Sequence, residues 1–260
     1  MPVQKKYKIT FLGTGTSQGV PLIGCICAVC CSENVKDKRL RSSILVETST
    51  TSIVIDTGPD FRQQMLKSKV NKLDAVVFTH GHKDHTAGFD DIRAFNYIQQ
   101  KDMEVYCDKR VEDVLRKDFD YVFADLKYPG VPKANLHRID GSPFEIGDIQ
   151  LIPIELKHFK LPVYGFRIGD FTYITDANYI SDTELDKVRG SKMLTLNALR
   201  KESHISHFTL DQAIALSKEL KADHTYFTHI SHQLGLNDTI NKDLGQTLSL
   251  AHDGLVIHSD

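Results

Sequence analysis

Thr79-His80-Gly81-His82-Lys83-Asp84-His85 is the stretch of this sequence that decides its fold and its chemistry. It directly follows Ala75-Val76-Val77-Phe78, an apolar run that predicts a buried strand over residues 75–78. Gly81 allows a sharp turn where a side chain would clash. On such a turn His80 and His82 project to one side, while Asp84 and His85 follow where a helix begins. The loop could therefore serve two adjacent metal ions, the first pair on one ion and the second pair on the other.

Two ions need further ligands, and three side chains at predicted strand ends could supply them. His158 follows the apolar run that begins at residue 149, Asp176 follows residues 171–174, and His229 follows residues 224–227. A carboxylate such as Asp176 can bridge two ions. Each residue alone is a weak indication, because a histidine at a strand end is more often a surface residue. Together they complete a set of seven ligands, which favours a metal site over a His-rich surface loop.

This pattern resembles the His-x-His-x-Asp-His motif of the metallo-β-lactamase superfamily, with the later ligand motifs following in order. The resemblance covers nearly the whole chain and implies an α/β fold, the αββα four-layer sandwich, as a single hydrolase domain over residues 1–260. It implies a dinuclear site that holds Zn²⁺ or Mn²⁺, both of which suit mixed imidazole and carboxylate ligands. It also places Asp84 among the catalytic residues. The implied ligands are His80, His82, Asp84, His85, His158, Asp176 and His229.

The cysteines form a second cluster. Four of the five cysteines lie within seven positions, at Cys25, Cys27, Cys30 and Cys31. In a reducing compartment such crowding favours metal binding over disulfides, although a redox pair of Cys27 and Cys30 is an alternative. The PhnP-like branch of the superfamily carries Cys-x-Cys-x-x-Cys with a later histidine. That resemblance implies a structural Zn²⁺ on Cys25, Cys27, Cys30 and His232, and leaves the role of Cys31 open.

The same branch also resembles the tRNA 3′-processing endonucleases, and both groups act on phosphodiesters. A similar His-x-Thr is present at His207-Phe208-Thr209, where Thr209 predicts the N-cap of an amphipathic helix over residues 209–221. The resemblance gives His207 the task of assisting the leaving group, with His204 as the competing candidate. We therefore expect a phosphodiesterase that hydrolyses a small phosphodiester, cyclic ones included, with a hydroxide shared between two metals.

Other functions stay open at this stage. A tRNase Z-like RNA-processing endonuclease is one, but the chain lacks an evident Gly/Pro- and Lys-rich arm, so a nucleic acid substrate is not favoured. A thioester hydrolase of the glyoxalase II type is another, although such enzymes usually lack the cysteine cluster. The 32 basic and 34 acidic residues leave a net charge of −2, which gives no sign of broad nucleic-acid binding.

The remaining sequence predicts one α/β domain, because strand and helix patterns interleave without a linker. No run approaches the roughly 18 apolar residues of a membrane span and no signal peptide is evident, so we expect a cytoplasmic protein without membrane partners. A homodimer stays open. Residues 120–134 predict an irregular loop, either a lid or a surface connection. Asp56 could orient a ligand histidine or simply form a turn. Strands are predicted over residues 7–12, 43–47, 52–55, 75–78, 149–154, 164–168, 171–174, 224–227 and 255–257, and helices over 60–67, 89–99, 109–117, 182–188 and 209–221.

Overall fold

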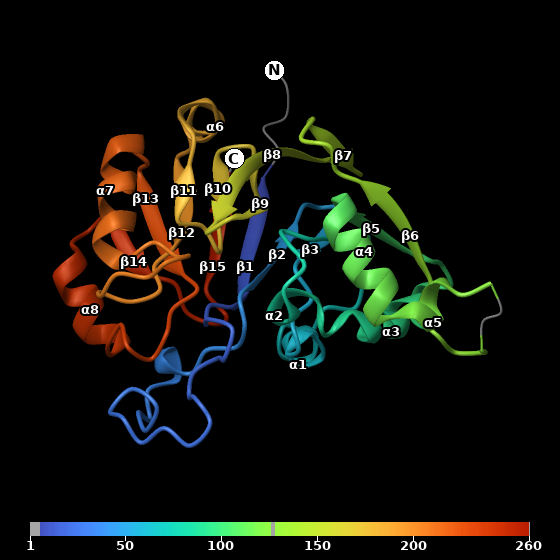
Figure 1. Ribbon diagram of the computed structural model, residues 1–260, viewed down its shortest axis with the longest axis horizontal. Coiled ribbons are helices and arrows are strands. Elements are labelled where there is room, and N and C mark those ends of the chain that lie inside the picture. Colours follow the sequence, from blue (N-terminus) through green and yellow to red (C-terminus); the bar gives the residue numbers. More distant parts are fainter. Residues whose placement is uncertain (1–5, 126–127, 260) are drawn as a thin grey trace.

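Two β-sheets lie face to face at the centre of the molecule, and helices cover the outer face of each sheet (Figure 1). The computed structural model describes residues 6–125 and 128–259. The layers are those of the αββα sandwich that the sequence predicted.

The first sheet has the strand order β15-β1-β2-β3-β4-β5-β6. Its first strands pair antiparallel, whereas β3, β4, β5 and β6 run parallel. Parallel neighbours present their carboxyl ends at one edge, and the histidine-rich loop leaves β4 at that edge. The strands are β1 (Tyr7–Gly13), β2 (Ser43–Glu47), β3 (Ser52–Ile55), β4 (Ala75–Val77), β5 (Met103–Cys107), β6 (Ala134–Arg138) and β15 (Val256–Ser259).

The second sheet has the strand order β11-β8-β9-β10-β12-β13-β14, and β7 pairs with β8 beside it. Here β10, β12, β13 and β14 are parallel, so their carboxyl ends again meet at one edge. The strands are β7 (Phe144–Ile146), β8 (Ile149–His158), β9 (Leu161–Ile168), β10 (Phe171–Tyr173), β11 (Tyr179–Ile180), β12 (Met193–Asn197), β13 (His224–Thr228) and β14 (Leu248–Leu250).

The core between the sheets follows from the alternation of side chains along each strand. In β3, Ile53 and Ile55 point into the space between the sheets, while Val54 faces the helices. Residues of β4 alternate in the same way, with Ala75 and Val77 inward. Strands β3 and β4 are therefore buried on both faces, which is why the sequence shows continuous apolar runs there.

The helices form the two outer layers. Helices α1, η2, α3 and α4 pack on the first sheet, and α6, α7 and α8 pack on the second (Figure 1). The helices are η1 (Val35–Asp37), α1 (Phe61–Lys67), α2 (Lys83–Thr86), η2 (Phe89–Ile92), α3 (Arg93–Gln99), α4 (Lys109–Asp118), α5 (Asp120–Phe123), α6 (Asp182–Val188), α7 (Leu210–Leu220) and α8 (Asn237–Leu244). None of the helices in the described ranges is long and apolar enough to cross a membrane.

Several elements differ from the sequence prediction. The helix expected over residues 89–99 is a 3₁₀ turn followed by α3, and the strand expected over 149–154 continues to His158. The prediction of an irregular loop over residues 120–134 was partly wrong. Its first residues form α5 and Ala134 already belongs to β6, because β5 offers this segment a free strand edge. Residues 126 and 127 of that loop lie outside the described residues.

Candidate metal centre

The histidine-rich loop leaves β4 and enters α2. His82 immediately precedes the first turn of α2, so Asp84 and His85 lie on that turn. Nε2 of His80 lies 3.1 Å from Nδ1 of His82, and the rings of His80 and His85 are 4.2 Å apart. A Cβ added to Gly81 would lie 3.0 Å from a methyl carbon of Val114 on α4. Gly81 is therefore needed for this close approach.

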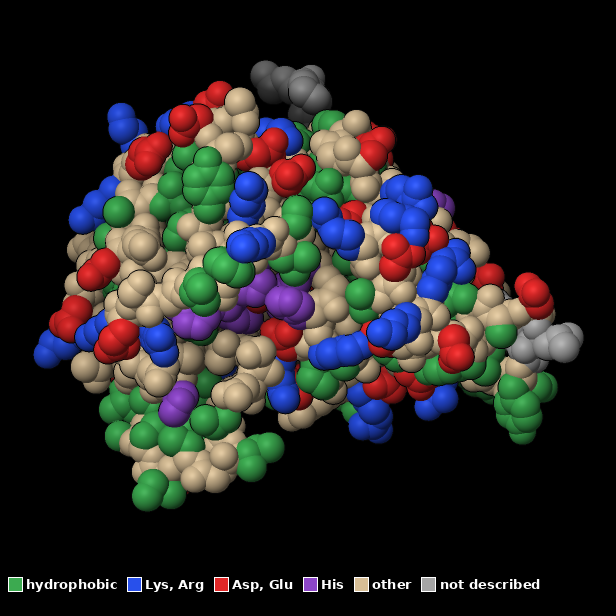
Figure 2. Space-filling model, viewed as in Figure 1, with side chains coloured by type: hydrophobic (Ala, Val, Ile, Leu, Met, Phe, Trp, Pro, Cys, Tyr) green, Lys and Arg blue, Asp and Glu red, His purple; other side chains and the backbone are tan. Residues whose placement is uncertain are grey.

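The structure brings the seven predicted ligands together in two adjoining clusters. In each cluster one ligand atom per residue lies within 4.8 Å of all the others. The His80 cluster contains His80, His82, His158 and Asp176, and the His85 cluster contains Asp84, His85, Asp176 and His229. Figure 2 shows the histidine side chains gathered in a hollow at the centre of the visible face.

Asp176 belongs to both clusters. Its Oδ2 atom lies 3.8 Å from Nε2 of His80 and 3.4 Å from Nε2 of His85. Its other oxygen, Oδ1, lies 2.9 Å from Nδ1 of His229. This carboxylate is buried and could bridge two cations, which is the position that the sequence predicted for it.

Asp56 holds one ligand histidine in place. Its fully buried carboxylate lies 2.7 Å from Nδ1 of His85, and it accepts hydrogen bonds from the backbone N–H and the hydroxyl of Thr79. With Nδ1 engaged in this way, Nε2 of His85 faces the carboxylates of Asp84 and Asp176. Of the two interpretations of Asp56, the structure supports the one in which it orients a histidine.

Other partners of the ligands were not found from the sequence. His158 places Nδ1 at 2.8 Å from the carbonyl oxygen of Ser206. His229 lies between the hydroxyls of Thr16, 3.3 Å from Nε2, and Ser42, 3.2 Å from Nδ1. These hydroxyls stand 213 and 187 residues away from His229 along the chain, so no local pattern could have revealed them.

Three residues of the site have left-handed backbone conformations. The φ angles are +68° at Asp56, +55° at Asp176 and +54° at His229. Residues with a Cβ adopt this region at a cost, and such strain clusters at functional sites. Each of the three follows the end of a strand, where the chain must turn its side chain toward the clusters.

The donor set fits divalent cations. Nε2 of His85 is buried and makes no well-aligned hydrogen bond among the described residues, but it lies 3.2 Å from a carboxylate oxygen of Asp84 and 3.4 Å from one of Asp176. Ligand atoms gathered in this way around a buried nitrogen suit a cation. Burial, followed by the charge of His85, lowers the pKa of His80 well below its usual value. Although burial alone would raise the pKa of Asp176, His229 and His85 together hold it well below its usual value. A neutral imidazole and an ionised carboxylate are the forms that bind metal.

His207 borders both clusters. Its ring centre lies 4.5 Å from that of His158 and 4.7 Å from that of His229. Its Nδ1 atom is buried and has no hydrogen-bond partner among the described residues. Burial, followed by the charge of His229, lowers the pKa of His207 to about 3. His204 lies beyond it, with ring centres 5.1 Å apart, so the geometry favours His207 as the histidine nearer the clusters.

The cysteine cluster lies on a loop between β1 and β2. Cys25, Cys27, Cys30 and His232 form a third group of potential ligands, and Nδ1 of His232 lies 3.4 Å from the sulfur atoms of both Cys25 and Cys27. The hydrogen bond with His232, followed by the N–H of Cys30, lowers the pKa of Cys27 to about 6. Cys31 is exposed and lies outside this group.

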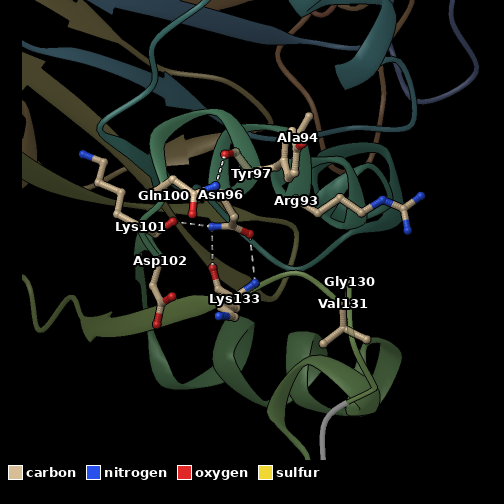
Figure 3. Close-up of a pocket in the computed structure, with 10 residues that line it drawn as sticks. All are labelled: Arg93, Ala94, Asn96, Tyr97, Gln100, Lys101, Asp102, Gly130, Val131 and Lys133. Carbon is tan, nitrogen blue, oxygen red and sulfur yellow. Dashed lines mark hydrogen bonds between the residues drawn. The ribbon is translucent and has the colours of Figure 1, made fainter.

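One hollow in the described part of the chain lies away from the clusters. It has a volume of about 510 Å³ and lies between α3 and the segment before β6. Figure 3 shows its lining, which includes Asn96, Tyr97 and Lys133 but no residue of the three clusters. A smaller cavity of about 360 Å³ lies beside His207. Of the two, the smaller cavity adjoins the clusters, because His207 and His232 line it.

Comparisons with known proteins identify the class. A family model described as "Beta-lactamase superfamily domain" matches residues 51–230, a range that contains both clusters and His207. The chain therefore belongs to the beta-lactamase superfamily, and it is a metal-dependent hydrolase.

A solved structure narrows the assignment. The crystal structure of a new diphosphatase from the PhnP family matches with a TM-score of 0.91 and 40% identity, over 98% of this chain and 97% of that chain. This chain is thus a member of the PhnP family, as the cysteine motif indicated. The short form of human tRNase Z matches with a TM-score of 0.70 and 18% identity, over 96% of this chain and 98% of that chain, which shows a shared fold alone.

One curated relative has a different activity in its name. An octanoyltransferase from Porphyromonas gingivalis (strain ATCC BAA-308 / W83) is 37% identical over 247 residues, which is 94% of this chain but 50% of that protein. The chain spans half the length of this relative. The name therefore describes a protein of which half lies outside the match.

Proposed function

We propose that this chain is a phosphodiesterase that hydrolyses a small phosphodiester, cyclic ones included, with two divalent cations, Zn²⁺ or Mn²⁺, in the adjoining clusters. The observation that carries the proposal is the carboxylate of Asp176, which both clusters share. Sites for two cations about 3.5–4 Å apart are typical of enzymes that cleave phosphate esters. The similarity to a PhnP-family diphosphatase supports chemistry at a phosphoryl group.

In this proposal His80, His82 and His158 hold one cation, Asp84, His85 and His229 hold the other, and Asp176 contacts both. When bound, the cations would neutralise charge on the phosphoryl oxygens and lower the pKa of a water molecule. Asp56 and the carbonyl of Ser206 keep the ring nitrogens of His85 and His158 pointed at the site.

Two further side chains act on protons. Burial would raise the pKa of Asp84, but His85 holds it well below its usual value, so its carboxylate can accept a hydrogen bond from the attacking water. A pKa of about 3 leaves the His207 ring neutral at pH 7, so its role is to donate an N–H hydrogen bond to the leaving oxygen. Hydrolysis adds the hydroxyl of water to phosphorus, breaks the bond from phosphorus to the leaving oxygen, and leaves the other proton of water on that oxygen.

The cysteine cluster is proposed to bind a structural Zn²⁺. Three thiols and one imidazole form a closed tetrahedral set. The N–H of Cys30 lies 3.4 Å from the sulfur of Cys27, which suits a thiolate. The N–H of Leu22 lies 3.4 Å from the sulfur of Cys30, but burial raises the pKa of that thiol to about 11. Such a reduced set fits the cytoplasm, where we place the protein. A single domain and a homodimer remain predictions.

A substrate screen tests the proposal. The purified protein, loaded with Mn²⁺ or Zn²⁺ and analysed for metal content, would be offered cyclic and linear phosphodiesters, a pre-tRNA and a glutathione thioester. We expect turnover of small phosphodiesters and metal in the preparation. Turnover of the thioester or the pre-tRNA alone would contradict the proposal, as would phosphodiester turnover that persists in Asp176→Asn.

A further inference from the structure

Asn178 lies two residues after Asp176, immediately before β11, and its side chain is half-buried. Its amide oxygen accepts a hydrogen bond from the backbone N–H of Phe159 at 2.7 Å, and its amide nitrogen donates to the carbonyl of Ile205 at 3.1 Å. One side chain therefore joins two segments that stand apart in the sequence, the turn after β8 and residues 204–208.

The first of these segments is the turn that follows the metal-ligand candidate His158. Phe159 in this turn has a left-handed backbone with φ +57°, a conformation that costs free energy for a residue with a Cβ. The backbone N–H of Asn178 donates to the carbonyl of Lys157 at 2.9 Å, so Asn178 bonds to the chain on both sides of His158. Asn178 therefore stabilises the turn where its backbone is strained.

The second segment carries His207. Hydrogen bonds hold the backbone on both sides of this residue, from Asn178 to the carbonyl of Ile205 and from the N–H of Phe208 to the carbonyl of Ala177 at 2.9 Å. In the described part of the chain, Nδ1 of His207 has no hydrogen-bond partner. The position of the ring therefore depends on the backbone of its own segment and on packing against the neighbouring histidines.

We infer that Asn178 is a positioning residue, which holds His207 against the leaving oxygen of the substrate through residues 204–208. The inference rests on the proposed function, in which His207 donates an N–H hydrogen bond to that oxygen. A leaving group that forms a stable anion needs little help of this kind, whereas a poorer leaving group needs more. Loss of the Asn178 side chain should therefore make the rate depend more steeply on the leaving group.

A matched pair of substrates tests this inference. Methyl p-nitrophenyl phosphate and methyl phenyl phosphate differ only in the nitro group, which stabilises the departing phenolate. Because a displacement of about 1 Å can cost about 10²-fold in rate, we expect Asn178→Ala to lower kcat for the phenyl ester by about 10–100-fold and for the nitrophenyl ester by less than about threefold. KM should change little for either ester, because His207 does not hold the phosphoryl group.

Two further variants accompany Asn178→Ala. Asn178→Asp keeps an acceptor for the N–H of Phe159 but has no N–H to donate to the carbonyl of Ile205, so it should show the same dependence on the leaving group. Asn135→Ala removes an exposed asparagine that donates to Glu104 at 3.0 Å on β6, and it should behave as the wild type does. Metal content and melting temperature should stay near the wild-type values in all three variants.

A double variant separates positioning from a general structural role. In His207→Ala the ring that Asn178 positions is absent, so the further change Asn178→Ala should cost little more. The two effects on kcat for the phenyl ester should therefore be far from additive.

Hydrogen exchange followed by mass spectrometry gives a readout besides turnover. Asn178→Ala should increase the exchange rate of the amides in residues 204–208, whereas Asn135→Ala should not.

Four results would overturn the inference while the proposed function stands: equal losses for the two esters, additive effects in the double variant, unchanged exchange in residues 204–208, or loss of metal from Asn178→Ala. If the wild type cleaves neither ester nor any other phosphodiester, the proposed function itself fails, and the inference fails with it.

Discussion

The two kinds of ligand cluster are built in opposite ways. The His/Asp clusters lie in the body of the molecule, where His80, Asp176 and His229 are almost fully buried at the ends of strands. The cysteine cluster lies on a loop that projects from the body (Figure 1), where Ile23 is 98% and Ile26 is 90% exposed. Only three buried apolar residues, Val20, Val29 and Cys30, form a core near that loop.

This difference predicts that cations in the His/Asp clusters serve the chemistry, whereas a cation in the cysteine cluster stabilises its loop. Strand pairing and hydrogen bonds such as the one between Nδ1 of His85 and the carboxylate of Asp56 already hold the ligands of the body. A cation there would therefore contribute to the chemistry more than to the stability of the fold. The cysteine loop has too small a core to fix itself, and in such loops a structural cation contributes the folding free energy. The following predictions test that contrast, beginning with the largest expected effect.

Asp176→Asn should abolish measurable hydrolysis, because the amide cannot bridge two cations as a carboxylate does. The expected loss in kcat/KM exceeds about 10³-fold, whereas the fold should be retained because Asn is of similar size. Steady-state kinetics, circular dichroism and elemental analysis would measure the three quantities. Wild-type turnover in a folded variant would refute the view that this carboxylate joins two cations.

His207→Ala should lower kcat by about 10²–10⁴-fold while metal content stays at the wild-type value. The reason is the loss of the N–H donor beside the clusters. His204→Ala provides the comparison, and its effect should be much smaller because His204 lies farther from both clusters. Loss of metal in His207→Ala would instead make this residue a ligand.

Cys27→Ser should remove one zinc per chain and lower the melting temperature by several degrees, with a smaller effect on kcat. Cys27 belongs to the cysteine cluster, whereas exposed Cys31 does not, so Cys31→Ser is the matched control. Zinc stoichiometry and thermal unfolding would be compared between the two variants. Equal zinc content in both would contradict the structural site.

The smallest expected effect is a pH dependence of the free energy of unfolding, and it comes from Asp253 at the base of the cysteine loop. Its carboxylate accepts hydrogen bonds from the hydroxyl of Thr14 and the N–H of Leu40. Asp253 as a whole is half-buried, but its carboxylate is enclosed and lies near the buried Arg39. Burial raises the pKa of Asp253 to about 6, although these neighbours lower it in part. The folded protein therefore keeps a proton that the unfolded chain, with a pKa near 3.9, releases first.

Because the pKa of Asp253 is higher in the folded protein than in the unfolded chain, protonation stabilises the fold. The stability contribution is fully present below pH 4 and is lost as the pH rises through 6, by about 2–3 kcal/mol in total. Asp253→Asn has no such proton. The free energy of unfolding of the wild type minus that of the variant should therefore decrease between pH 4 and pH 7, as denaturant titrations would show. A difference that is constant over this range would mean that Asp253 does not titrate there.

The sequence predicted strands β2 and β3 of the first sheet better than its edge strand β6. Ser43–Glu47 and Ser52–Ile55 were predicted with their observed bounds, because every residue except the terminal Glu47 is buried and either apolar or small. Strand β6 was missed because it is an exposed edge whose strand form depends on pairing with β5. Strand β12 was missed although it is buried, since a run of five residues gives little periodicity.

In the candidate site, too, the sequence revealed some residues and not others. Its seven ligands are histidines and aspartates, residue types that bind metal ions, so local motifs and a family resemblance were enough to select them. Thr16 and Ser42, which contact His229, carry no such indication, because hydroxyl groups occur throughout any protein surface. Their importance comes only from where the folded chain places them.

Both His/Asp clusters draw side chains from both sheets, and this has a practical consequence. The loop after β4 supplies one part of each cluster, while His158, Asp176 and His229 come from strands beyond residue 148. If the gene were divided in the segment before β6, neither fragment alone would carry a complete set of ligands for either cation. Cation uptake by the mixed fragments would then report their reassembly.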